Sequence, residues 1–187
     1  INVTAQMPLM DVSRLASVLT TLSSQGKNIT VISFGNYTVP GNATTYDVSG
    51  QGDKSIVAYV PTTMYGGWWW GVQNGTELRV TDTNRDMVAF ASGNSICFKS
   101  GASDTSTVFD NIKTINFDAV DTTRVTSAAY AFYNMKSLTT ITGLSRWDTS
   151  KITTMNSMFK RCTGLKSLDF SSFNTKNVTD FSSMMYG

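Results

Sequence analysis

The chain has 187 residues, which is enough for one substantial domain or for a small domain with an extension. Hydrophobic residues make up 41% and charged residues 15%, which excludes the high-charge, low-hydrophobicity composition of disordered chains. The net charge is +2 with scattered Lys and Arg, and no apolar run approaches the ~20 residues of a membrane span, so neither nucleic-acid binding nor membrane insertion is expected.

The N-terminal part predicts one helix followed by strands. In residues 11–24, apolar side chains recur on one helical face, and Gly26 provides a stop signal. The pair Asn74-Gly75 separates two strand-like runs and predicts a hairpin. Strands are expected at Ile29–Phe34, Tyr46–Val48, Ile56–Val60, Trp68–Gln73 and Thr76–Thr81.

Three adjacent tryptophans lie just before that hairpin turn. Side chains alternate along a strand, so Trp68, Trp69 and Trp70 cannot all face one side. One hypothesis is an exposed aromatic platform that, with Tyr65, binds a glycan or a protein. The alternative is that two of these rings pack inside the protein and the third lies flat over the hairpin.

The C-terminal part contains an internal repeat. Three segments align, residues 115–138, 142–165 and 168–187, and the third stops before it is complete. Their shared anchor is an apolar residue, then Asp or Asn, then Thr. From Asp121 to Asp148 to Asn174 the steps are about 27 and 26 residues.

Each repeat is expected to contain a short strand, a turn and a short helix. The strand would carry apolar residues such as Leu165, Leu168 and Phe170, and Asp148 and Asn174 would bond to turn backbone. Helices would begin at N-cap threonines and bury one apolar stripe at spacings i, i+3, i+4 and i+7. The threonines are Thr126, Thr153 and Thr179, and the clearest stripe is Met155, Met158, Phe159 and Cys162.

These repeats resemble the BspA-like leucine-rich repeats of bacterial surface proteins. The matching residues are Met158-Phe159, Cys162, Leu165, Leu168, Asp169-Phe170, Phe173, Asn174-Thr175, Val178 and Thr179. The resemblance covers Ile112–Gly187 and extends back over Tyr46–Asn111 through Asp47–Tyr59 and Ser103–Phe109. The first repeat departs from the pattern at Ala131-Phe132, and Ile141–Leu144 carries one extra residue.

The expected fold class is therefore α/β, a leucine-rich-repeat-type solenoid of short parallel strands and short helices behind a β-rich N-terminal cap. Residues 1–45 would form a helix and strand segment or a tether, residues 46–111 the cap, and residues 112–187 the repeats. Solenoids need capped ends, so further repeats are expected after Gly187.

The residues favour recognition over catalysis. Histidine is absent, and no phosphate loop, nucleophile elbow or metal motif is present, so we expect no enzyme, no cofactor and no metal site. Cys97 and Cys162 are expected to be buried free thiols. The resemblance implies an extracellular adhesin that binds a host or neighbouring-cell protein or glycan. The alternative is a structural appendage of a virus or phage particle that contacts the host.

Overall fold

The computed structural model describes residues 10–41, 43–47, 56–62, 69–82, 85–90, 94–99 and 101–187, with backbone only for 43–47 and 56–62. None of the helices in these residues is long and apolar enough to cross a membrane. The helical elements are η1 (Val12–Arg14), α1 (Leu15–Ser24) and η2 (Leu144–Arg146). The strands are β1 (Val31–Phe34), β2 (Ala43–Asp47), β3 (Ile56–Thr62), β4 (Trp69–Asn74), β5 (Glu77–Asp82), β6 (Val88–Ala89), β7 (Thr114–Phe117), β8 (Val120–Asp121) and β9 (Thr140–Thr142).

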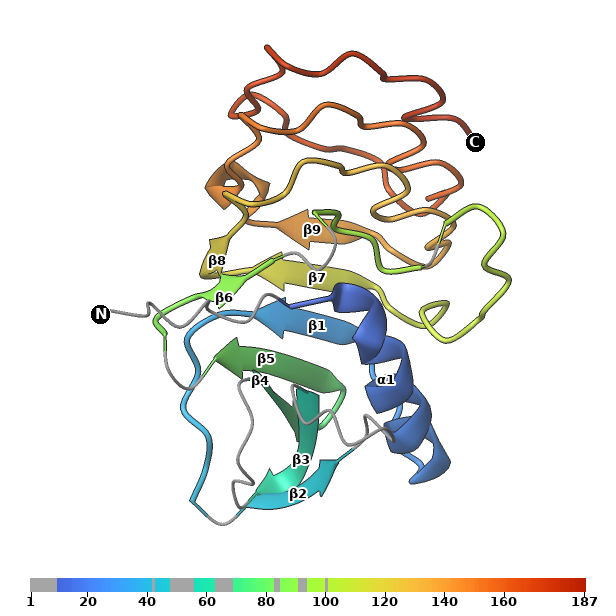
Figure 1. Cartoon of the computed structure of the whole chain (residues 1–187). Coiled ribbons are helices and arrows are strands. Elements are labelled where there is room, and N and C mark those ends of the chain that lie inside the picture. Colours follow the sequence, from blue (N-terminus) through green and yellow to red (C-terminus); the bar gives the residue numbers. More distant parts are fainter. Residues whose placement is uncertain are drawn as a thin grey trace, which may run out of the picture.

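Seven strands form one sheet in the order β2-β3-β4-β5-β1-β7-β9 (Figure 1). Four of its pairings are parallel, and β2–β3 and β4–β5 are antiparallel. The fold is thus mixed α/β with a mostly parallel sheet and few helices. Strands from each of the three predicted segments share this sheet, with β1 between β5 and β7.

The predicted N-terminal helix is confirmed. Asp11 accepts a hydrogen bond from the Ser13 backbone N–H and starts the helical segment. Leu15, Val18 and Leu22 are fully buried on the face of α1 that packs into the core. The chain ends the helix at Gly26, whose φ of 75° is left-handed, as the stop signal predicted.

The predicted hairpin is also confirmed. β4 and β5 pair antiparallel from Trp69 opposite Asp82 to Asn74 opposite Glu77. Gly75 takes a left-handed φ of 59° in the turn between them. The sequence signal for this hairpin, the pair Asn74-Gly75, was therefore local, since these two residues set both the turn and the register of the strands.

Beyond β1 in the order of the sheet, three coils of chain stack on one another, and the first two supply β7 and β9 (Figure 1). We call residues 112–137 the first coil, 138–164 the second and 165–187 the third. The prediction of short helices in these coils is wrong. Residues 128–135, 155–162 and 181–187 form successive turns, in which left-handed residues recur four positions apart. These pairs are Tyr130 and Asn134, Ser157 and Arg161, and Ser183 and Gly187.

Hydrogen bonds between coils replace the bonds of a helix. In the first coil, the N–H groups of Ala128, Tyr130 and Phe132 donate to carbonyls 26 residues later, at 2.9–3.0 Å. Intervening N–H groups close the turns, as Ala131 does on Ala128 O at 3.2 Å. The apolar spacing still buries its side chains, because a four-residue turn period places nearly the same positions inside as a helix does. Met155, Met158, Phe159 and Cys162 are all buried.

The threonines predicted as N-caps have another role. The Thr153 N–H and hydroxyl both donate to Thr126 O, at 2.9 and 3.2 Å, and Thr179 donates in the same way to Thr153 O. These threonines therefore hydrogen-bond to the neighbouring coil, whereas an N-cap would have bonded to the first turn of its own helix. The strand expected at Leu165, Leu168 and Phe170 is also wrong: this stretch has no strand, although its side chains pack against the core.

One hydrophobic core runs from α1 into the stack. Aromatic rings follow one another along it, including Phe34, Phe117, Phe132 and Phe159, with neighbouring ring centroids 5.1–6.2 Å apart. Each coil therefore buries its inner face against its neighbours, which is why the coils order without long helices.

Both cysteines are free, as predicted; Cys162 is buried and Cys97 partly so. Burial raises the pKa of each thiol to about 11. At pH 8 the thiolate fraction is then about 100-fold below that of an unfolded chain. We expect iodoacetamide to label the native protein about 100-fold more slowly than the unfolded protein, by mass spectrometry. Fast labelling of the native chain would contradict this burial.

Candidate functional site

From β5 through β1 and β7 to β9, the sheet has one apolar and one polar face. Ile32, Phe34, Leu78, Ile115 and Phe117 point into the core and are fully buried. The alternate residues point to the other side. Their register places Ser33 of β1 beside Arg79 of β5 and Asn116 of β7, and Asn116 beside Thr142 of β9. We call Ser33, Glu77, Arg79, Asn116 and Thr142 the polar sheet face.

A chain of hydrogen bonds crosses this face over four strands. The Thr142 hydroxyl donates to Asn116 Oδ1 at 2.8 Å, and Asn116 Nδ2 donates to Ser33 Oγ at 3.0 Å. Ser33 Oγ donates to Glu77 Oε2 at 2.8 Å, and Arg79 Nε donates to Glu77 Oε1 at 2.6 Å. Ser33 and Arg79 both donate to the Glu77 carboxylate, and Asn116 and Thr142 extend the chain from Ser33, so the side chains are held in fixed orientations.

Tyr37 lies across the end of the polar sheet face. Its ring contacts Gly35, where an added Cβ would lie 2.9 Å from Tyr37 Cζ, and the Arg79 guanidinium carbon lies 5.2 Å from the ring centroid. Its hydroxyl donates to Asp118 Oδ2. Burial and the neighbouring Asp118 carboxylate raise the pKa of Tyr37, so the phenol stays a neutral donor.

The polar sheet face is exposed at both ends. Ser33 is buried and Glu77 is 26% exposed, whereas Arg79 at one end and Thr140 and Thr142 at the other are exposed, and Asn116 is intermediate. Asn116 keeps one amide hydrogen beyond the bonds described, and Thr142 keeps acceptor capacity. Preoriented amide and hydroxyl groups of this kind suit recognition of a carbonyl-bearing or hydroxyl-bearing ligand.

The structure places the predicted aromatic platform only in part. Trp69 and Trp70 are 1% and 0% exposed and point to opposite faces of β4: Trp69 joins the main core and Trp70 packs with Val72 and Val39. Neither ring is available to a ligand, which agrees with the packing alternative for these two. Tyr65 and Trp68 lie outside the described residues, so the platform stays a prediction there.

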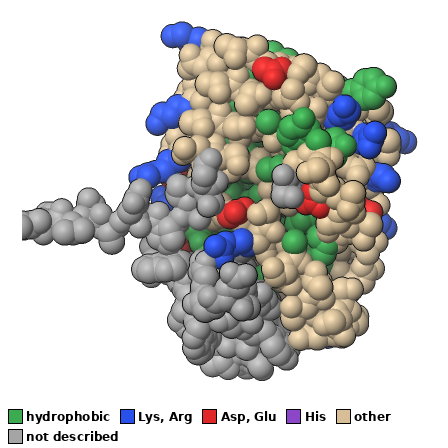
Figure 2. Space-filling view, turned by 45° about the vertical axis from the view of Figure 1, so that its right-hand side comes forward, with side chains coloured by type: hydrophobic (Ala, Val, Ile, Leu, Met, Phe, Trp, Pro, Cys, Tyr) green, Lys and Arg blue, Asp and Glu red, His purple; other side chains and the backbone are tan. Residues whose placement is uncertain are grey.

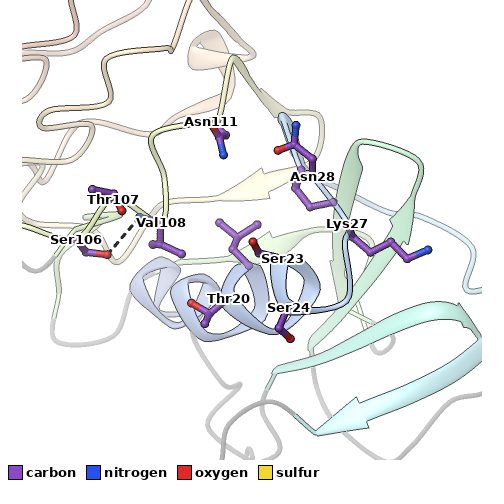
Figure 3. Close-up of a pocket in the computed structure, with 11 residues that line it drawn as sticks. Thr20, Ser23, Ser24, Lys27, Asn28, Ser106, Thr107, Val108 and Asn111 are labelled. Carbon is purple, nitrogen blue, oxygen red and sulfur yellow. Dashed lines mark hydrogen bonds between the residues drawn. The ribbon is translucent and has the colours of Figure 1, made fainter.

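A hollow of about 580 Å³ lies between the end of α1 and residues 106–111 (Figure 3). Asn28 and Asn111 both line it, and Lys27 extends away from it. Its base is apolar, with Leu19 and Ile29 each 5% exposed. Apart from Val108 and Lys27, the rest of the lining is hydroxyls and amides, and the lining contains no acidic residue.

Lys and Arg side chains lie along both edges of the molecule in Figure 2, several of them near one another at the right-hand edge, with hydrophobic side chains between the two edges. Among the residues that the structure describes, no three His, Cys, Asp or Glu side chains gather as a metal site would require.

Aspartates shape the turns of the stack, as the sequence predicted. Asp148 Oδ1 accepts the Ser150 N–H at 2.9 Å and its hydroxyl at 2.6 Å, and Asn174 Oδ1 accepts the Lys176 N–H at 3.1 Å. The Ser150 hydroxyl and N–H lower the pKa of the Asp148 carboxyl.

The lowered pKa of Asp148 predicts a dependence of stability on acid. A carboxyl with a depressed folded pKa stabilises the fold above its unfolded pKa and loses that contribution as pH falls through its folded pKa. Asn keeps this turn at Asn174, so Asp148→Asn removes only the ionisable part. We expect the variant's loss of unfolding free energy, from urea denaturation, to be largest at pH 7 and to shrink as the pH falls below the ordinary carboxyl pKa of about 4. A loss of unfolding free energy that stays the same from pH 7 to acid for Asp148→Asn would contradict the mechanism.

The polar sheet face was missed by sequence reasoning. In the sequence, the only sign of this face is an alternation of apolar and polar residues over four positions of a strand, as in Thr114–Phe117. Strands so short give little periodicity, and the partners that complete the face lie as many as 83 residues away.

A family model described as "Mycoplasma protein of unknown function, DUF285" matches residues 103–187. The match takes in all three coils and the loop before them. No curated protein and no solved structure matches the chain.

Proposed function

We propose that the chain is a non-enzymatic recognition module of a cell surface, and that it binds a host or neighbouring-cell protein or glycan through the polar sheet face. The observation that carries this proposal is the hydrogen-bonded chain from Thr142 to Glu77, which preorients polar side chains on four neighbouring strands. Preorientation lowers the entropy lost on binding, which is what a recognition surface needs.

The stack fits the solenoid that the resemblance to BspA-like surface proteins implies. Coils repeat at 26 or 27 residues, and each hydrogen-bonds only to its neighbours in the bonds described. The buried Thr122 and Thr149 hydroxyls repeat one contact: each accepts the N–H of Asp148 or Asn174 in the next coil, at 2.8 and 2.7 Å. We therefore propose a leucine-rich-repeat-type solenoid in which turns replace the usual helices.

The test is a binding screen against matrix proteins and glycans. Thr142→Arg places a large side chain at the exposed end of the polar sheet face, and Thr105→Arg makes the same change in the exposed loop before the first coil. We expect Thr142→Arg to weaken binding about tenfold or more and Thr105→Arg to leave it unchanged. Equal binding by both variants would remove the site from this face.

Two further measurements complete the test. Trp68→Ala examines the remaining aromatic platform without touching the buried Trp69 and Trp70, and a loss of binding in that variant alone would move the site there. Hydrolysis of any bound glycan by the wild-type chain would contradict a non-enzymatic role.

A further inference from the structure

The segment that ends at Lys99 packs against the first coil. The N–H groups of Ile96 and Phe98 donate to Ser127 O and Ala131 O, at 3.1 and 3.0 Å, so the first coil lies between this segment and the second coil. The side chain of Lys99 is only 1% exposed. A charged amine this deep in the protein costs free energy unless its neighbours compensate for the lost water.

The neighbours of this amine compensate for it only in part. Lys99 Nζ lies 3.4 Å from the backbone carbonyl oxygen of Asn134 and 3.5 Å from Asp110 Oδ1, and both contacts are long for a charged group. The side-chain oxygens Asp110 Oδ1 and Asn134 Oδ1 are buried, and neither has a hydrogen-bond partner among the described residues. Buried polar atoms are nearly always paired, so an amine, a carboxylate and a carboxamide left in this state at one place need an explanation.

Phenylalanine rings enclose the same place. Phe98, Phe109 and Phe132 are 0–1% exposed, and the ring centroid of Phe98 lies 5.6 Å from that of each of the other two. Phe98 and Phe109 directly precede Lys99 and Asp110 in the chain, so packing of the rings brings the amine and the carboxylate together. The rings also exclude water, which would otherwise compete with the amine as a nucleophile.

We propose that Lys99 and Asn134 become joined by an intramolecular amide bond. Lys99 gives two of its ammonium protons in turn to the Asp110 carboxylate, which passes both to Asn134 Nδ2. The freed electron pair of Nζ attacks Asn134 Cγ, the Nζ–Cγ bond forms, the Cγ–Nδ2 bond breaks, and an ammonium ion leaves. Asp110 ends as the carboxylate it began as, and no oxidant, metal or second molecule takes part.

Asn134 is held where this reaction needs it. It has a left-handed φ of 57°, and its N–H donates to Lys160 O of the second coil at 2.8 Å. Four bonds separate Cγ from the backbone oxygen that contacts Nζ, so rotation of the two side chains brings Nζ and Cγ together. Groups held in this way react readily, because proximity replaces a chance encounter. The corresponding left-handed residue of the second coil is Arg161, which has no carboxamide.

The bond would fasten the chain before the first coil to the coil itself. Its two ends are 35 residues apart in the sequence, so it closes a loop that contains residues 101–111 and most of the first coil. Closing such a loop lowers the conformational entropy of the unfolded chain and so stabilises the folded one. The bond goes beyond the proposed recognition function and does not depend on it, because no residue of the polar sheet face takes part.

Mass spectrometry of the folded 187-residue chain tests the proposal. We expect an intact mass below the calculated mass by one ammonia molecule, and a tryptic product that joins residues 86–113 to residues 125–136. Lys99→Arg keeps the charge without the primary amine and should have the calculated mass. Asp110→Ala should slow bond formation about 100-fold, followed over time after cell-free synthesis. Asn111→Ala, the same kind of change at an exposed neighbour, should form the bond as the wild type does.

Four results would overturn the proposal. The calculated mass in a wild-type chain that circular dichroism shows to be folded would leave Lys99 in an ordinary buried ion pair. Loss of ammonia without the joined peptides would place the reaction at another asparagine. Loss of water, with Lys99 joined to Asp110, would make the carboxylate the partner and not the proton carrier. An unchanged rate in folded Asp110→Ala would exclude the proposed proton transfer.

Discussion

Replacing Gly143 by alanine is expected to lower the free energy of unfolding by more than about 3 kcal/mol. Gly143 has a φ of 82°, a left-handed conformation that costs alanine about 1 kcal/mol. An added Cβ would also lie 2.0 Å from Phe117 O, in the strand of the coil below. Both obstacles are backbone features, so a change of rotamer cannot relieve them.

The clash lies between two coils and cannot be relieved locally. Phe117 ends β7, and Gly143 follows β9, which pairs with β7 from Thr114 opposite Thr140 to Asn116 opposite Thr142. Moving Gly143 outward would strain these pairings and the η2 turn that follows. The largest part of the loss therefore comes from separation of the first and second coils.

Urea denaturation followed by circular dichroism measures this effect. Gly41→Ala is the matched control, because its added Cβ meets nothing within 4 Å, and we expect a change within about 0.5 kcal/mol. Equal denaturation midpoints for the two variants would show that the first and second coils are not closely packed at Gly143.

Gly143 also shows how far the sequence could predict the stack. The repeat alignment identified an extra residue within Ile141–Leu144, and the structure places a left-handed glycine there. Periodicity could reveal the insertion, because it shifts the later anchors by one position. It could not reveal the contact with Phe117 O, which depends on how the two coils stack.

Sequence patterns predicted correctly those elements that depend on interactions between residues close together in the chain. The helix at Leu15–Ser24 and the turn at Asn74-Gly75 depend on residues within a few positions, and both were predicted. The short repeat helices failed because the decisive hydrogen bonds join residues 26 apart, such as Tyr130 N–H to Asn156 O. An i, i+3, i+4, i+7 spacing fits a helix and a chain of four-residue turns equally well.

The candidate sites were harder to predict for the same reason. Composition singled out the tryptophans, but whether a ring is exposed depends on what covers each face of β4, and Trp69 and Trp70 are both covered. The residues of the polar sheet face form no sequence motif, and only the register of the strands brings them together, as it places Asn116 between Ser33 and Thr142. Sequence reasoning therefore favoured a conspicuous motif over an assembled surface.

Truncation of Trp147 to alanine is expected to cost about 3–5 kcal/mol of unfolding free energy. Trp147 is 3% exposed, and its ring lies 5.0 Å from that of Phe117 and 6.0 Å from that of Phe132 in the first coil. It also stacks at 6.3 Å on Phe173 of the third coil. One side chain therefore packs against the coils on both sides.

Two variants separate packing from the indole itself. Trp147→Phe keeps a ring and removes a buried Nε1 that has no hydrogen-bond partner among the described residues, so we expect less than half the loss caused by alanine. Phe181→Ala truncates an aromatic ring that is 46% exposed in the third coil, and we expect about 1 kcal/mol or less.

Hydrogen exchange should show where the Trp147→Ala chain loosens. Contact with Phe173 is lost, so the third coil should detach more readily, and the amides that bind it should exchange faster. These are the amides of Met155, Ser157 and Phe159. Amides of α1, such as Leu22, should keep a higher protection, because they lie at the other end of the core. Uniform acceleration across the chain would mean instead that the core unfolds as one unit and that Trp147 has no special place between the coils.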